Sequence, residues 1–191
     1  MSPARARRAD AQRNYELLLA AAREVFGERG ADAALDEVAR RAGTGNATMY
    51  RHFPTRRELI IAVYADEVEA LCARGEALLA EQPPEDALFA WLRDFVAHVA
   101  TKRDLALAIP DGHDEQRSDL FDRWHKAMRA TASRLLVRAQ SAGGVSADLN
   151  PADLLTLASG IAVASADTDQ AERCLELLRR GIVPPRDQGA V

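Results

Sequence analysis

The stretch LDEVARRAGTGNATMYRHF, residues 35–53, decides the fold of the N-terminal part of the chain. Apolar side chains recur at helical spacing over residues 35–39, and Gly43 follows as a residue that tolerates the positive φ of a helix end. A second short helix is expected over about residues 46–52, and Pro54 prevents it from continuing. Two short helices joined by a glycine-containing turn are typical of a helix-turn-helix motif.

The outward side of the second short helix suggests what this motif binds. Its side chains are small or form hydrogen bonds, and almost none is apolar: Asn46, Ala47, Thr48, Arg51 and His52. Such side chains fit a DNA major groove about 12 Å wide, and Gly45 leaves backbone N–H groups that suit a phosphate. An ordinary helical hairpin has the same spacing, so the spacing by itself leaves both interpretations open.

Helical patterns continue along the rest of the chain. No Asn-Gly or Asp-Gly turn joins two alternating apolar runs, so strands are not expected. Apolar stripes predict a first helix ending at Gly30, longer helices over about residues 55–80 and 85–99, a short helix plus loop over 101–117, a long helix from about 120 to 142, and two last helices starting at Asn150-Pro151 and near Asp169. We therefore predict an all-helical protein.

Composition and charge set the broad class. The chain has 191 residues, 48% of them apolar and 28% charged, which is ordinary for a globular protein. Its two cysteines lack zinc-binding spacing, and no apolar run reaches the roughly 20 residues of a membrane span. No signal peptide is recognisable either, so a reducing cytoplasm is the simplest setting.

The net charge of −4 is unevenly distributed. Residues 1–60 have an excess of three positive charges, and the remainder has an excess of seven negative charges. A basic N-terminal part is typical of a nucleic-acid partner, but charge alone favours the simpler interpretation of an arginine-rich solvated surface. Residues 1–10 are predicted to be a flexible basic arm. Its Arg5, Arg7 and Arg8 either reach a DNA groove or only keep the arm soluble. Residues 184–191 are predicted to be a flexible tail.

Three short segments resemble the N-terminal domain of TetR-family transcriptional regulators. They are Ala39-Arg40-Arg41-Ala42-Gly43, Thr48-Met49-Tyr50-Arg51-His52-Phe53-Pro54 and Arg57-Glu58-Leu59, and the resemblance extends over about residues 11–62. It implies a helix-turn-helix DNA-binding domain of three helices over 11–55 and an effector-binding and dimerisation domain over 56–183. It also implies a homodimer, usually a repressor, that a small molecule releases from a double-stranded operator.

The resemblance assigns roles to individual residues of the motif. Asn46 and Ala47 would lie nearest the base edges, and Arg56 would contact the DNA backbone. Phosphate contacts are implied for Thr48, Tyr50 and His52. The complete predicted DNA-binding set is Thr44, Gly45, Asn46, Ala47, Thr48, Tyr50, Arg51, His52 and Arg56. Family members commonly have other residues at Ala34, Thr44 and Gly45, so individual contacts are weakened and the operator sequence stays open.

The C-terminal part contains a candidate ligand pocket and a candidate dimer interface. Aromatic and polar residues that either line a pocket or form ordinary core are Trp91, Phe95, His98, Trp124 and Met128. His98, Arg103 or His125 is a candidate polar anchor for a small, mostly apolar effector. The last two helices have more apolar surface than one helix pair buries, which predicts a two-fold interface through Leu154, Leu157, Ala158, Ile161, Leu175 and Leu178.

Other classes of function find little support in the sequence. His113-Asp114-Glu115 and the later His125 lack the helical spacing of metal ligands, so a charged loop is the simpler interpretation and no metal site is expected. Phosphate-binding loops and catalytic motifs are missing, so an all-helical enzyme has no residues to assign and no cofactor is expected. A DNA-binding regulator that answers to a protein partner, or to no effector, remains the alternative.

Overall fold

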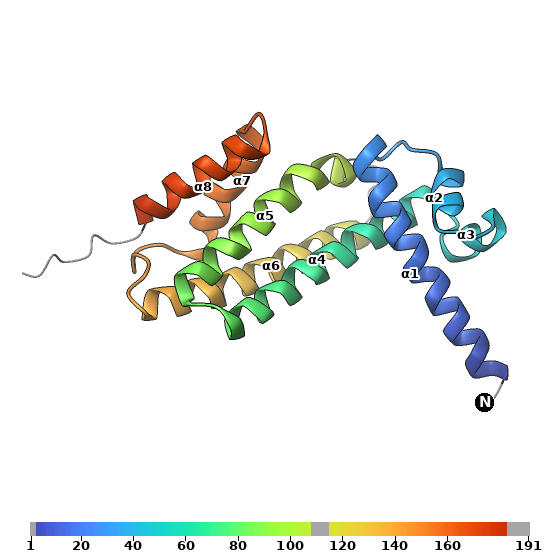
Figure 1. Ribbon diagram of the computed structural model, residues 1–191, viewed down its shortest axis with the longest axis horizontal. Coiled ribbons are helices and arrows are strands. Elements are labelled where there is room, and N and C mark those ends of the chain that lie inside the picture. The colour runs from blue at the N-terminus through green and yellow to red at the C-terminus, as the bar shows by residue number, and fades with distance from the viewer. Residues whose placement is uncertain (1–2, 108–114, 183–191) are drawn as a thin grey trace, which may run out of the picture. The chain divides into compact units, whose positions relative to one another are not determined.

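The computed structural model describes residues 3–107 and 115–182, which form eight helices and no strand (Figure 1). This confirms the all-helical prediction over the described residues. In chain order the helices are α1 (Pro3–Arg29), α2 (Leu35–Arg41), α3 (Asn46–His52), α4 (Arg56–Glu81), α5 (Pro84–Leu107), α6 (Glu115–Ser141), α7 (Pro151–Ala164) and α8 (Thr168–Ile182).

The chain divides into two compact units. Unit 1 comprises residues 1–66 and 101–113, and unit 2 comprises residues 67–100 and 114–191. The division falls within α4, and the domain limits predicted from the sequence stay a prediction. No helix of the described residues is long and apolar enough to cross a membrane.

In unit 1, α1, α2 and α3 pack against one another around a small apolar core. Leu18, Ala22 and Val25 of α1 are fully buried, as are Val38 of α2 and Met49 of α3. Figure 1 shows α2 and α3 lying beside the C-terminal half of α1. The turns of α1 before this contact region are exposed from residue 8 to residue 13.

The first helix begins earlier than the sequence pattern suggested. Residues 3–10, expected to be a flexible arm, belong to α1. This segment has no apolar stripe to reveal it, but it consists mainly of alanine and arginine, which have high intrinsic helix propensity. The other expected tail, residues 184–191, lies outside the described residues.

The core of unit 2 is formed by α4, α5 and α6 around Trp91. Its indole Nε1–H donates a hydrogen bond of 3.0 Å to the carbonyl oxygen of Leu71, and its ring stacks on Phe95 with centroids 5.5 Å apart. Gly75 permits this packing, because a Cβ there would overlap the Thr131 methyl group and approach the indole to 3.1 Å. The three helices therefore meet where α4 has no side chain.

Two sets of polar contacts fix the last two helices of unit 2. Asn150 caps α7, with its side-chain oxygen accepting hydrogen bonds from the backbone N–H groups of Ala152 and Asp153, as the Asn-Pro signal predicted. Arg179 of α8 donates hydrogen bonds of 2.7 Å to both Glu85 and Asp86 in the first turn of α5. These two carboxylates raise the pKa of Arg179, with the Asp86 hydrogen bond as the largest cause.

The stretch between α5 and α6 differs in part from its prediction. A short helix plus loop was expected over residues 101–117, but α5 continues without interruption to Leu107. The break was expected because this stretch contains Pro110 and Gly112, but both follow Leu107 in the sequence and so do not interrupt α5. Residues 108–114 lie outside the described part.

Candidate nucleic-acid interface

A glycine turn sets the angle between α2 and α3. Gly43 has a φ of +66°, the left-handed conformation that favours glycine. Its N–H donates to the Arg40 carbonyl oxygen at 3.2 Å, and the Thr44 N–H donates to the Ala39 carbonyl oxygen at 3.0 Å. This pair of bonds is a Schellman motif, which ends α2 and redirects the chain into α3.

Two large apolar side chains fix α3 on unit 1. Met49 is fully buried and Phe53, directly after the helix, is 3% exposed. The Phe53 ring packs on Tyr15 of α1, with centroids 5.1 Å apart, and the His52 ring lies edge-on to Tyr15 at 6.1 Å. Because this side of α3 is buried, the opposite side faces outward.

The structure brings eight of the nine predicted DNA-binding residues together on this outward surface. Exposed residues are Gly45, Asn46, Ala47, Tyr50 and Arg51, and half-buried residues are Thr44, Thr48 and His52. They extend from the turn to the end of α3. Because they are small or polar around one basic side chain, they can reach base edges and donate hydrogen bonds to phosphates.

Arg56, the ninth predicted residue, has a different role in the structure. Its Nη1 donates hydrogen bonds of 2.7 Å and 2.6 Å to the carbonyl oxygens of Ala31 and Ala33, and the side chain is half-buried. Since these carbonyls belong to the loop between α1 and α2, Arg56 fastens that loop to the start of α4. The expected DNA-backbone contact of Arg56 is therefore not supported.

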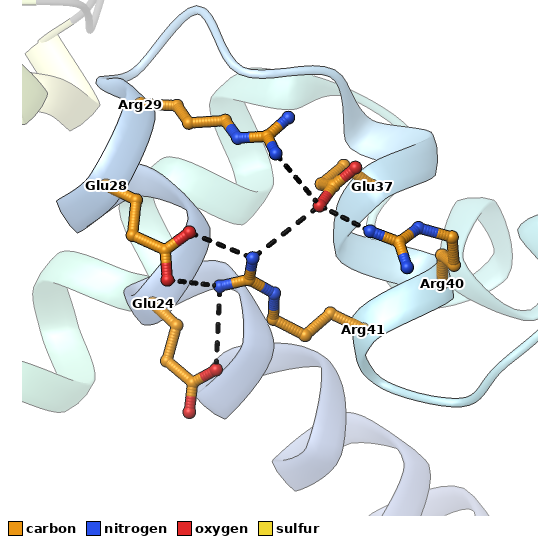
Figure 2. A network of polar contacts seen from close by, with 6 residues as sticks. All are labelled: Glu24, Glu28, Arg29, Glu37, Arg40 and Arg41. Carbon is orange, nitrogen blue, oxygen red and sulfur yellow. Dashed lines mark hydrogen bonds and ion pairs between the residues drawn. The ribbon is translucent and has the colours of Figure 1, made fainter.

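An ion-pair network that the sequence did not reveal holds α2 on α1 (Figure 2). Arg41 makes two hydrogen bonds to Glu28, of 2.6 Å and 2.9 Å, and lies 3.8 Å from Glu24 and 3.6 Å from Glu37. Glu37 also contacts Arg29 and Arg40. The Glu28 hydrogen bond raises the pKa of Arg41, and the same bond lowers the pKa of Glu28.

These partners settle the role of Arg41 within unit 1. Its guanidinium faces three carboxylates, so it is committed to the contact between α1 and α2 rather than to DNA. The Glu28 bond joins residues 13 positions apart, a separation at which a sequence pattern gives no signal. Only the spacing of Glu37 and Arg41 at i, i+4 was visible in the sequence.

The five residues predicted to line a pocket all lie in unit 2, but in different surroundings. Trp91, Phe95 and Met128 are buried. Trp124 is half-buried, with its ring edge-on to Phe121 at 5.3 Å. The stacking and hydrogen bond of Trp91 favour the ordinary-core interpretation for this residue.

His98 takes part in a polar contact beneath the surface. Its Nδ1 lies 3.8 Å from an oxygen of Glu67, and the two side chains are 7% and 13% exposed. A buried histidine and carboxylate on neighbouring helices offer a ligand both a donor and an acceptor. Of the other candidate anchors, Arg103 has no described side chain, and His125 is exposed and bonded to the Phe121 carbonyl at 2.7 Å.

An open depression lies along α6, apart from the predicted pocket residues. Its volume is about 550 Å³, and the residues around it are Asp119, Leu120, Asp122, Arg123 and Lys126. None of the five residues predicted to line the ligand pocket borders this depression.

The six residues predicted for the dimer interface divide into two groups. Leu154, Ala158 and Leu175 are buried within their own chain, which favours a core role. Leu157 is 47% exposed, and Ile161 and Leu178 are half-buried. Two large apolar residues that the prediction left out, Val163 and Leu177, are also exposed, Leu177 by 65%.

The possible metal ligands remain separate in the described part of the chain. Over residues 3–107 and 115–182, no three histidine, cysteine or acidic side chains come together in a metal-binding group. His113 and Asp114, which the sequence pattern did not support as metal ligands, lie outside the described residues.

Known proteins match both parts of the chain. The model of the tetR family of bacterial regulatory proteins matches residues 18–63, and a model described as the C-terminal domain of SbtR-like transcriptional regulators matches residues 83–184. With α2, the turn and α3, these matches define a helix-turn-helix transcriptional regulator. The chain belongs to the TetR family.

Solved structures agree over nearly the whole chain. A TetR transcriptional regulator from Streptomyces coelicolor is 36% identical, covers 90% of this chain and 99% of its own, and has a TM-score of 0.78. A TetR regulatory protein from Mycobacterium vanbaalenii is 34% identical, with coverage of 93% and 99% and a TM-score of 0.76.

Curated relatives match over shorter regions. The HTH-type transcriptional regulator CymR from Pseudomonas putida is 33% identical over 57% of this chain and 55% of its own length, so the chain spans about half of that relative. The HTH-type transcriptional activator FasR from Mycolicibacterium smegmatis is 44% identical over 31% of this chain and 27% of its own.

Proposed function

We propose that this TetR-family regulator is a repressor that binds a pseudo-palindromic operator as a homodimer and is released by a small, mostly apolar effector. The observation that supports the DNA-binding part is the outward surface of α3. Burial of Met49 and Phe53 and the Gly43 turn present a continuous row of small and polar side chains. A bacterial protein with this function acts in the cytoplasm, where the operator DNA is found.

The proposed contacts divide by position along α3. Asn46 and Ala47, in the first turn, contact base edges, since an asparagine amide can bond adenine and a methyl group can meet a thymine methyl. Thr48, Tyr50 and His52 contact phosphates, with Thr44, Gly45 and Arg51 beside them. In a dimer the two α3 helices then meet half-sites about one helical turn, some 34–36 Å, apart.

Substitutions on α3 test this division. Operator duplexes are first selected from a random pool with the wild-type protein, and affinities are then measured by fluorescence anisotropy. Asn46→Ala should relax preference at one base pair per half-site, at a cost of roughly 1–3 kcal/mol, whereas the matched change Tyr50→Phe should weaken all duplexes alike. Equal weakening of every duplex by Asn46→Ala would refute base reading.

The apolar surface of the last two helices supports the homodimer. Leu157 and Val163 of α7 and Leu177 of α8 are exposed, and half-buried Ile161 and Leu178 border them. Large apolar side chains gathered on one helix pair favour burial against an identical pair, which gives a two-fold interface. Light scattering at micromolar concentration should give twice the chain mass, and a monomer would contradict the proposal.

The effector is proposed to bind in unit 2 near His98 and Trp124. The buried contact between His98 and Glu67 provides hydrogen-bonding groups, and the paired rings of Phe121 and Trp124 on α6 provide apolar area. Such an effector lowers operator affinity by stabilising a dimer whose α3 helices have the wrong spacing. Linkage requires that bound operator weakens effector binding by the same factor.

A thermal-shift screen followed by titration of an operator complex tests the effector. A compound that binds the native protein raises its unfolding midpoint and should release the labelled operator. A compound that binds tightly without changing operator affinity would refute release. The compact packing of Trp91 and Phe95 favours one alternative, a regulator that is controlled by a protein partner or by no effector. In that case no compound in the screen would change operator binding.

A further inference from the structure

The positive charge of the N-terminal part is concentrated at the start of α1. Residues 1–13 contain four arginines and one acidic residue, whereas residues 14–60 contain seven arginines and seven acidic residues. The whole positive excess of the first 60 residues therefore lies in the first 13. The helix-turn-helix body itself has no net charge with which to attract DNA.

Most arginines of that body are bound to other groups of unit 1. Arg23 pairs with Asp66 at 3.1 Å, and Arg29 and Arg40 pair with Glu37. Arg41 and Arg56 are held by the carboxylates and carbonyls described above. These side chains stabilise unit 1, and little of their charge is left for a phosphate.

The arginines at the start of α1 are in a different situation. Arg5, Arg8 and Arg13 are exposed, and they form no ion pair or hydrogen bond with any residue that the structure describes. The local hydrogen bond there, of 2.8 Å, joins Gln12 to Glu16 instead. These three guanidinium groups are therefore available to an anionic partner.

The position of α3 relative to this segment follows from Tyr15. Its ring contacts His52 and Phe53 at the C-terminal end of α3. Arg8 precedes Tyr15 by seven residues, about two helical turns, so it lies on the same side of α1 and about 10 Å further along the axis. Arg5 is about 5 Å beyond it. Figure 1 shows these turns of α1 extending past α3.

We propose that the first turns of α1, through Arg5 and Arg8, bind the phosphate backbone beside the DNA segment that α3 contacts. This proposal rests on the proposed DNA-binding function. The two arginines lie about 10–15 Å along α1 from Tyr15, the residue that contacts the end of α3. This distance is comparable to the width of a DNA groove, about 12 Å, so the arginines meet the backbone bordering it. Guanidinium groups bind phosphate oxygens with two parallel N–H donors. These contacts add affinity without reading sequence.

Salt dependence distinguishes this role from base reading. The double variant Arg5→Gln/Arg8→Gln removes two charges and keeps good helix formers in α1. The control Arg123→Gln/Arg129→Gln removes the same charge from exposed positions of α6. Both variants and the wild type are titrated with a selected operator duplex and with a shuffled duplex of equal length over a range of salt concentrations.

Each lost phosphate contact should lower the slope of log affinity against log salt by about 0.9. The double variant should therefore lose about 1.8 in slope for each bound chain, and each chain should account for an affinity loss of about 60-fold at 0.1 M salt, on both duplexes. The control should keep the wild-type slope. Arg5→Lys/Arg8→Lys should also keep it, because lysine binds phosphate as a point charge.

Three results would overturn the proposal. They are an unchanged slope in the glutamine variant, an equal loss in the control, and a lysine variant as weak as the glutamine variant. If Asn46→Ala still relaxes operator preference in that experiment, only the role of α1 fails. If the wild-type protein binds neither duplex, the proposed function fails with it.

Discussion

Replacing Arg56 by alanine should destabilise the protein without changing its electrostatic contact with DNA. The change removes two hydrogen bonds that the charged guanidinium donates, and the Ala31 and Ala33 carbonyl oxygens lose this donor. Bonds to charged groups contribute about 1.5–3 kcal/mol each, and the half-buried position lets water replace part of this. We expect a loss of about 2–3 kcal/mol in the free energy of unfolding, or about 4–12 °C in Tm for a chain of this size.

The assay measures stability and DNA binding on the same two variants. Thermal and urea unfolding are followed by circular dichroism, and DNA binding is followed by anisotropy at several salt concentrations. Arg51→Ala is the matched control, because Arg51 is exposed on α3. It should leave Tm unchanged and lower the salt slope by about 0.9 per bound chain. The interpretation of Arg56 would be refuted by a normal Tm together with a reduced salt slope in Arg56→Ala.

Further predictions concern both units. Gly75→Ala should destabilise unit 2 by about 1–3 kcal/mol in urea unfolding, because the added methyl group overlaps the Thr131 methyl group. Adding Thr131→Ser, which removes that methyl group, should recover part of the loss. Normal stability of the single variant would contradict the close approach of the helices. The bond to Arg41 lowers the pKa of Glu28. Its stabilising effect is therefore fully present at a pH above 4.5, the ordinary pKa of the carboxyl group, and is lost as the pH falls through the lowered pKa. Glu28→Gln should remove this part of the acid dependence of Tm. Leu157→Glu should convert the dimer to a monomer in light scattering with little change in helicity, since the side chain is exposed in the single chain; a persistent dimer would place the interface elsewhere.

Local signals made the helix-turn-helix predictable. The end of α2 depends on the left-handed conformation of Gly43, and the burial of Met49 follows from helical spacing within a few residues. The cap of α7 depends in the same way on Asn150 and its immediate neighbours. Features of this kind can be found in a single sequence because the interacting groups are close in the chain.

Long-range contacts explain what the sequence did not predict. Arg56 bonds to carbonyls 25 and 23 residues away, and backbone acceptors leave no mark in the sequence. The apolar spacing of α7 identified Leu154 and Leu157 equally, because only packing against other helices decides which side is buried. The start of α1 was missed for the opposite reason, since an exposed helix needs no apolar stripe.

The two aromatic chromophores are divided between the two units. Trp91 and Trp124 both belong to unit 2, whereas Tyr15, Tyr50 and Tyr64 all belong to unit 1. Selective excitation of indole therefore monitors unit 2 alone, and Trp91, enclosed and hydrogen-bonded to a helix carbonyl, should emit at shorter wavelength than a solvated indole. Tyrosine absorbance senses unit 1, including Tyr50 on the exposed side of α3. The native chain thus contains separate optical reporters for each unit, and the order in which they unfold can be measured without attaching a dye.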